Sequence, residues 1–162
     1  MTRRPFIRLL SILGLTGAAA SPGRSASIPS RADRVEFSDA QWRQRLSDSA
    51  YRVLRSEGTE PPHSSPLNLE MRAGHFHCAG CDLPLFASSA KYESGTGWPS
   101  FFETLAGALG TKTDFKMILP RTEYHCARCG GHQGHLFSDG PRPSGRRYCN
   151  NGVALRFVAA AS

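Results

Sequence analysis

The pattern of apolar and polar positions predicts two short helices near the start of the folded region. Ser38 and Gln41 have the spacing of a capping box, so a helix is expected to begin at Asp39. Residues 47–58 then place apolar side chains at helical intervals, and Gly58 is a typical helix stop. The three prolines of the following stretch, "TEPPHSSPLN", make that segment irregular.

The rest of the chain changes to short extended segments separated by glycines. In chain order these segments are GHFHC, FKMILP, TEYHC, GHLFSD, RRYC and VALRFV. Their spacing predicts antiparallel β-structure whose long loops carry most of the polar residues. Because both helices precede this region, we expect them to pack on its outside or at one end.

A length of 162 residues suits one folded domain, and a separate segment precedes it. The stretch "TRRPFIRLLSILGLTGAAASPGRSA" has a basic head, an apolar middle too short to span a membrane, and a small-residue tail. This is the layout of an export signal, and its paired arginines favour the twin-arginine route to the bacterial periplasm. A Sec-type signal or a disordered basic tail is the alternative.

The expected organisation has four parts. They are a signal over residues 1–26, a linker over 27–36, a folded domain over 37–158 and a tail over 159–162. Two small-residue sites suit cleavage of the signal, Ala18–Ala20 and the vicinity of Ala26.

The formal net charge of +7 is a weak argument for binding nucleic acid or a membrane surface. More than half of this charge comes from four arginines within residues 1–26, a segment that contains no acid. The domain without its signal is therefore expected to bind neither nucleic acid nor, stably, a membrane.

Four of the five cysteines form two Cys-x-x-Cys pairs, Cys78 with Cys81 and Cys126 with Cys129. A tight turn of this spacing presents two thiolates to one tetrahedral ion, and two such turns complete a closed structural Zn²⁺ site. Two disulfides, one redox-active pair, or iron in place of zinc are the alternatives.

The fifth cysteine, Cys149, has no such partner and lies between arginines and asparagines in "RRYCNN". Basic neighbours lower the pKa of a thiol and favour a nucleophilic thiolate. Two further stretches are unusual for packing alone: "SGTGWPSFF" holds Trp98 in a loop, and "GGHQGHLFSDGP" holds His132 and His135. A buried inert cysteine, a packed tryptophan and structural histidines remain the alternative interpretation.

In this order, "SGTGWPSF", "HQGHLFSDGP" and "RYCNNGVALRF" resemble the motifs of the B-type methionine sulfoxide reductases. The similarity extends from about Arg34 to about Val158. It implies a mainly β fold, with two antiparallel sheets in a tent-like arrangement, short N-terminal helices and a zinc clamp. It also implies reduction of the R epimer of methionine sulfoxide in proteins, a repair reaction under oxidative stress.

The resemblance assigns roles to individual residues. It implies that Cys149 attacks the sulfoxide sulfur and is left as a sulfenic acid. The other implied catalytic residues are His132, His135 and Asn151, the implied substrate contacts are Trp98, Phe137, Asp139 and Arg147, and the implied zinc ligands are Cys78, Cys81, Cys126 and Cys129.

The chain also departs from the family. Thr96 stands where many members have a resolving cysteine, which implies a single-cysteine enzyme reduced by an external thiol or a thioredoxin-like partner. "TEPPH" replaces the usual "TERPF", so the entrance near Pro61 and His63 is expected to be shaped differently. Positions that the family varies or fills differently are Gln133, Asn150 and Gly152.

Two other functions compete with this one. A zinc-knuckle module that binds nucleic acid or protein without catalysis would leave Cys149 and the two histidines unexplained. A protein with the same fold and an inactive site would bind partners but turn nothing over.

Overall fold

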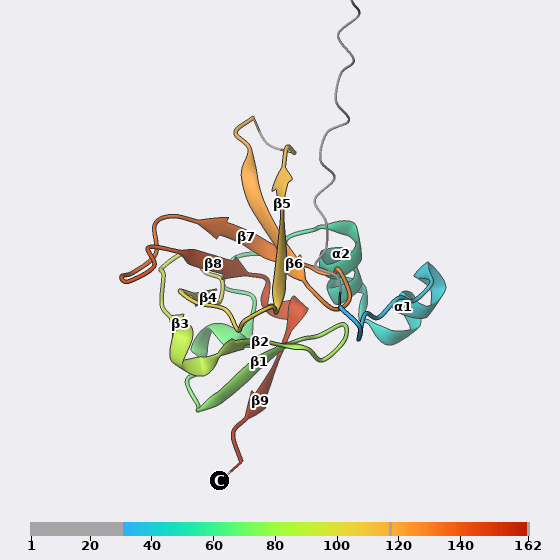
Figure 1. Cartoon of the computed structure of the whole chain (residues 1–162), viewed down its shortest axis with the longest axis horizontal. Helices are drawn as coiled ribbons and strands as arrows, with labels where there is room; N and C mark the ends of the chain where they lie inside the picture. Colours follow the sequence, from blue (N-terminus) through green and yellow to red (C-terminus); the bar gives the residue numbers. More distant parts are fainter. Residues whose placement is uncertain (1–30, 117, 162) are drawn as a thin grey trace, which may run out of the picture.

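The computed structural model describes residues 31–116 and 118–161 (Figure 1). The predicted export signal, residues 1–26, lies outside the described part. The elements, in chain order, are α1 (Asp39–Arg45), α2 (Asp48–Ser56), η1 (Pro66–Leu69), β1 (Gly74–Cys78), β2 (Pro84–Ala87), η2 (Ser88–Ala90), β3 (Lys91–Tyr92), β4 (Ser100–Phe101), β5 (Leu109–Asp114), β6 (Arg121–Cys126), β7 (His132–Phe137), β8 (Arg147–Asn150), η3 (Gly152–Ala154) and β9 (Leu155–Ala159), where η denotes a 3-10 helix.

The strands form two antiparallel sheets, as the resemblance implied. The smaller has the order β2-β1-β9, and the larger has the order β3-β4-β8-β7-β6-β5 (Figure 1). In the larger sheet, β8 lies between β4 and β7, so its backbone is paired with a neighbouring strand on both edges. The fold is therefore mainly β, with the chain's last strand returning to the smaller sheet.

Buried aromatic side chains from both sheets form the core. Phe86 of the smaller sheet stacks on Phe101 of the larger one, with ring centroids 4.1 Å apart, and Phe76 meets Phe101 edge-on at 5.0 Å. Tyr124 and Tyr148 continue this cluster, with centroids 5.4 Å apart. Aromatic pairs at these separations add to the stabilisation from burial alone, so the two sheets are joined face to face here.

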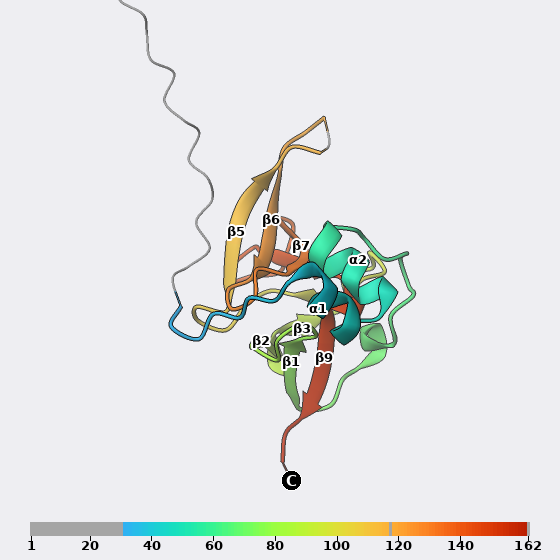
Figure 2. The same cartoon turned by 90° about the vertical axis from the view of Figure 1, so that its right-hand side faces the viewer.

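Both helices form where the sequence predicts them. At the start of α1, Ser38 Oγ accepts the N–H of Gln41, and the Gln41 side chain accepts the N–H of Ser38, which completes the capping box. The predicted stop is one residue late, because Glu57 rather than Gly58 takes the left-handed conformation, with φ 53°. In the second view, α2 lies beside β7 on the outside of the sheets (Figure 2).

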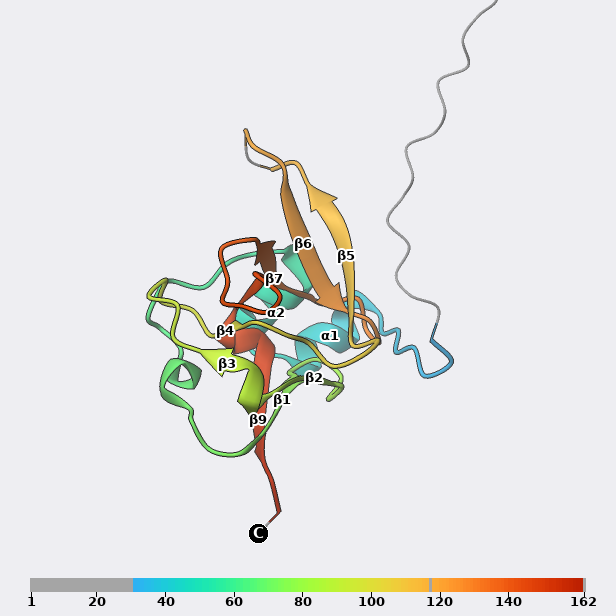
Figure 3. The ribbon, with the colours of Figure 1, turned by 60° about the vertical axis from the view of Figure 1, so that its left-hand side comes forward.

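The β5–β6 hairpin projects from the body of the domain (Figures 1 and 3). The predicted strand FKMILP is wrong: this segment links β5 to β6, and its residues Phe115, Ile118 and Leu119 are at least 76% exposed. The pairing is made instead by the polar segment LGTKTD, which forms β5. A short apolar run forms a strand only where a neighbouring strand or core covers it, and none covers the described residues of this tip.

The helices that the structure describes are all too short and too polar to cross a membrane.

Candidate functional site

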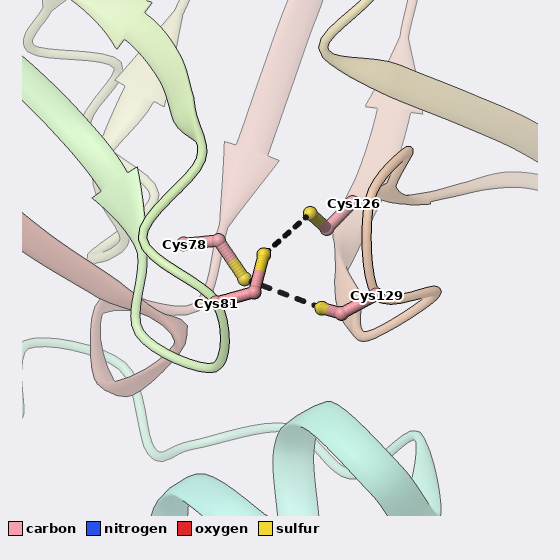
Figure 4. A group of neighbouring side chains, drawn as sticks. All are labelled: Cys78, Cys81, Cys126 and Cys129. Atoms are coloured by element: carbon pink, nitrogen blue, oxygen red, sulfur yellow. Dashed lines mark hydrogen bonds between the residues drawn. The ribbon is translucent and has the colours of Figure 1, made fainter. Parts of the chain in front are cut away.

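Two turns of the same geometry carry the paired cysteines. Cys78 and Cys126 are the last residues of β1 and β6, so each turn begins where a strand ends. Asp82 and Gly130, which follow the second cysteine of each pair, have φ of 63° and 69°. Their N–H groups donate to the carbonyls of the first cysteines at 2.8 and 2.9 Å. The two turns therefore present their sulfurs to each other (Figure 4).

The four sulfurs converge on one point between the sheets. Sγ of Cys78 is 3.7 Å from Sγ of Cys129, Sγ of Cys81 is 3.5 Å from Sγ of Cys126, and all four lie within 4.8 Å of one another. A tetrahedral ion with metal–sulfur bonds of about 2.3 Å needs sulfurs about 3.8 Å apart. A disulfide needs about 2.05 Å. The four-cysteine cluster thus fits a metal ion, and it ties the smaller sheet to the larger one.

Cys149 lies in the middle of the larger sheet. Ser100 of β4 and His135 of β7 are its partners in the strand register, and its side chain lines a cavity of about 120 Å³. The other residues that line this cavity are Thr59, Trp98, Arg121, Gly134, His135, Phe137, Asn150 and Asn151. The indole of Trp98 and the ring of Phe137 give it an apolar surface, while His135 and Asn151 supply polar groups beside the thiol.

Trp98 is held by the loop that precedes β4. Gly97 has φ 90°, which favours glycine, and its carbonyl accepts the N–H of His63 at 2.7 Å and Nδ2 of Asn68 at 3.1 Å. The indole Nε1 of Trp98 donates to the carbonyl of Glu60 at 3.1 Å. The position of the ring is thus fixed from both its backbone and its polar edge.

The thiol of Cys149 is half-buried, and burial raises its pKa. The hydroxyl of Thr96, 4.0 Å from Sγ, and the guanidinium of Arg147 lower this pKa, but by less. The expected lowering by two arginines is therefore not found. Arg146 is exposed, and the charge of Arg147 is shared with the carboxylate of Asp139.

Arg147 and Asp139 are not among the described residues that line the cavity. Two hydrogen bonds of 2.8 Å join them, and this pairing lowers the pKa of Asp139 and raises that of Arg147. The Arg147 guanidinium lies 4.2 Å from the centroid of the Phe137 ring. Phe137 lines the cavity, and the paired Arg147 guanidinium packs on its ring.

His135 faces the cavity, and its Nε2 lies 2.8 Å from Oδ2 of Asp114. The same carboxylate accepts Nη2 of Arg121 at 2.8 Å and the N–H of Lys116 at 2.9 Å, and these bonds lower the pKa of Asp114. Burial lowers the pKa of His135 more than Asp114 raises it. Because an ionised carboxylate can only accept, a neutral His135 donates its Nε2 proton to Asp114.

His132 has a different setting from His135. It is only 2% exposed, its ring centroid is 5.4 Å from that of His135, and it is not among the described residues that line the cavity. Its Nδ1 lies 3.0 Å from Oε1 of buried Glu123, although the two groups are not aligned for a hydrogen bond. The strand register shifts at this point, since His135 pairs with Glu123 and His132 with His125, and the two rings stay in edge-to-face contact with His132 in the more buried position.

Asn151 is fixed by three hydrogen bonds at the edge of the cavity. Its Nδ2 and backbone N–H both donate to the carbonyl of Gln133, at 3.0 and 2.9 Å, and its Oδ1 accepts the N–H of Glu60 at 3.0 Å. The buried carboxylate of Glu60 in turn accepts the N–H groups of Gly152 and Val153. Glu60 thus joins Trp98 to the segment after Cys149, a role that the sequence analysis did not assign to it.

Comparison with known proteins finds one family model and three similar relatives. A family model described as the SelR domain matches residues 46–159. "Peptide methionine sulfoxide reductase MsrB" of Agrobacterium fabrum is 46% identical over 125 residues, which cover 76% of this chain and 93% of the relative. The protein of the same name in Thiobacillus denitrificans is 50% identical over 120 residues, which cover 74% of this chain and 91% of the relative. "Peptide methionine sulfoxide reductase B1, chloroplastic" of Arabidopsis thaliana is 41% identical over 148 residues, 86% of this chain and 73% of the relative.

Proposed function

Because the chain belongs to the SelR-domain family of peptide methionine sulfoxide reductases, we propose that it reduces the R epimer of methionine sulfoxide in peptides and proteins. The observation that carries the proposal is the position of Cys149 in a cavity that combines Trp98 and Phe137 with His135 and Asn151. A methyl sulfoxide needs both kinds of surface, one for its methyl group and one for its oxygen. A non-catalytic zinc-knuckle module is not favoured, since the matching relatives carry the name of an enzyme.

The first step transfers the sulfoxide oxygen to Cys149. The thiolate attacks the sulfoxide sulfur and forms an S–S bond, and the oxygen takes up the thiol proton. The hydroxyl group then passes from the substrate sulfur to Cys149, so that the S–S bond and the sulfoxide S–O bond break and a new S–O bond forms at Cys149. The thiol proton ends on this oxygen, so the products are methionine and a Cys149 sulfenic acid. The substrate sulfur gains two electrons and Cys149 loses two.

His135 is suited to move the proton in this step. Since its Nε2 proton is held by Asp114, Nδ1 is the ring nitrogen that remains for proton transfer. The raised pKa of Cys149 leaves little thiolate in the free enzyme at pH 7, so a base in the cavity is needed. His135 takes the thiol proton and returns it to the sulfoxide oxygen as the S–S bond forms.

Recycling requires a thiol from outside the chain. Thr96 stands 4.0 Å from Cys149 Sγ, at the position where many family members carry a resolving cysteine, and the other four cysteines belong to the cluster. One external thiol attacks the sulfenic acid and releases water, and a second one releases Cys149 and leaves as a disulfide. A small thiol or a thioredoxin-like protein fills this role.

Zinc is the metal that best suits the four-cysteine cluster, because four thiolates in closed tetrahedral array are typical of structural Zn²⁺ sites. Bound there, the ion would cross-link the two sheets. We also retain the twin-arginine export signal in residues 1–26 and a periplasmic location as part of this proposal.

The test supplies peptide-bound methionine sulfoxide as separate R and S epimers, with dithiothreitol as the reductant. The wild-type chain is expected to consume the R epimer alone, and Cys149→Ser is expected to consume neither. Ser138→Ala, which changes a residue outside the cavity lining, serves as the matched control and should behave as wild type. Consumption of the S epimer, or R turnover that persists in Cys149→Ser, would contradict the proposal.

A further inference from the structure

One side chain connects the four-cysteine cluster to the catalytic cavity. Gln133 is fully buried at the start of β7, between the second cysteine turn and Cys149. Its Nε2 donates to Sγ of Cys78 at 3.3 Å, and its Oε1 accepts Nδ2 of Asn150 at 3.3 Å. Its backbone carbonyl accepts both donors of Asn151. One residue thus contacts a ligand of the cluster and both asparagines that line the cavity.

These contacts are tightly packed, so a displacement of one residue must move its partners as well. Gln133, Asn150 and Asn151 are each at most 3% exposed, and a buried amide loses free energy if a partner moves away. The next residue, Gly134, lies so close to β8 that an added Cβ would be 1.9 Å from the carbonyl oxygen of Cys149. A shift of β7 at Gln133 is therefore passed to β8 at Cys149.

We propose that Gln133 is a positioning residue that couples metal binding at the four-cysteine cluster to sulfoxide binding in the catalytic cavity. When the cluster is filled, Cys78 Sγ is fixed, and the Gln133 amide holds Asn150 and Asn151 in place for the substrate. Coupling of this kind is reciprocal, so a bound sulfoxide must strengthen metal binding by the same factor as the metal strengthens sulfoxide binding. This inference rests on the proposed function, because it takes a sulfoxide as the cavity's ligand.

The test measures both ligands without turnover, in the full chain with Cys149→Ser. The affinity for Zn²⁺ is measured by competition with a chelator, with and without a saturating peptide R-sulfoxide, and binding of the sulfoxide is measured by calorimetry. The expected result is a Zn²⁺ affinity at least about fivefold higher with the sulfoxide present, the lower range of measured couplings. Adding Gln133→Met, which keeps the volume but removes both hydrogen bonds, is expected to bring this ratio to about one.

The control variant is Thr104→Val, which removes a hydroxyl hydrogen bond to the carbonyl of Leu85 away from both sites and should keep the wild-type ratio. If Gln133→Met does not fold, Gln133→Leu removes the same two bonds. Two results would overturn the coupling. One is the same ratio of Zn²⁺ affinities, with and without sulfoxide, whether or not Gln133→Met is added to Cys149→Ser. The other is a Zn²⁺ affinity of the Cys149→Ser chain that sulfoxide does not change. Absence of any sulfoxide binding would instead contradict the proposed function.

Discussion

The four paired cysteines lie in two turns that close on each other, whereas Cys149 lies in the middle of a sheet and lines a cavity. In the cluster, each sulfur has other sulfurs within 4.8 Å, so any one thiolate is committed to a shared ion. Around Cys149 the nearest partners are the hydroxyl of Thr96 and the guanidinium of Arg147, which leave the sulfur free to react.

The difference shows that the surrounding residues determine whether a cysteine acts as a metal ligand or as a nucleophile. Two short turns position the thiolates of the cluster, and the conformation of each turn is determined by a few consecutive residues. Reactivity at Cys149 needs a cavity whose lining comes from five separate segments, including those around Thr59, Trp98 and Arg121. The domain therefore keeps a structural thiol site and a reactive thiol site in one small fold.

The largest expected effect comes from breaking the cluster. Cys129→Ser removes one of four ligands, so the chain should lose its metal and its free energy of unfolding should fall by more than about 4 kcal/mol. Metal content by mass spectrometry and urea unfolding would measure both. Cys149→Ser is the same chemical change in the other setting, and it should alter the free energy of unfolding by less than about 0.5 kcal/mol. Loss of metal from Cys149→Ser would show that the two thiol settings are not distinct.

A smaller effect is expected from the apolar wall of the cavity. Trp98→Ala removes the indole that meets the substrate methyl group, and kcat/KM for the R-sulfoxide should fall by about 20-fold, which corresponds to about 2 kcal/mol of lost burial. Metal content should not change. Trp98→Phe keeps an aromatic face and should lose much less, and equal losses for both variants would point to the Glu60 hydrogen bond instead of the apolar surface.

The smallest effect concerns the pKa of Cys149. Because burial raises this pKa, the thiolate fraction is small at pH 7, and alkylation by iodoacetamide should accelerate about tenfold per pH unit as the pH rises toward the pKa. Thr96→Val removes a hydroxyl that lowers the pKa, so its rate profile should shift to higher pH. Thr96→Ser restores the hydroxyl and should restore the profile. A shift to lower pH in Thr96→Val would contradict the role of this hydroxyl.

Local sequence was enough to predict the helix starts and the cysteine turns. A capping box at Ser38 and Gln41 and a Cys-x-x-Cys turn closed by Asp82 or Gly130 each involve fewer than six residues, and all formed as expected. Membership of the family made the two-sheet architecture predictable as well. The pairing of the strands was harder to predict, since the expected strand FKMILP is a link whose residues Phe115, Ile118 and Leu119 are exposed, and the polar segment LGTKTD forms β5 instead.

The support behind the cavity was not predictable from the sequence. Glu60 holds Trp98 and Asn151 from a proline-rich loop, and Asp114 holds His135 from the end of β5, with β6 between the two strands. Their roles could not be read from the sequence, because their partners are distant in the chain and meet only when the sheets form. His132 shows the reverse case, since its spacing suggested a cavity residue and the strand turns it toward Glu123.

The most direct test of the central claim identifies which cysteine the substrate oxidises. The metal-loaded chain is mixed with one equivalent of peptide R-sulfoxide without reductant, trapped with dimedone, digested and mapped by mass spectrometry. The account predicts one methionine formed per chain, a dimedone adduct on Cys149 alone, and four cluster cysteines that remain unmodified with their metal. A disulfide between Cys149 and a cluster cysteine, or an adduct on Cys81 or Cys129, would contradict it.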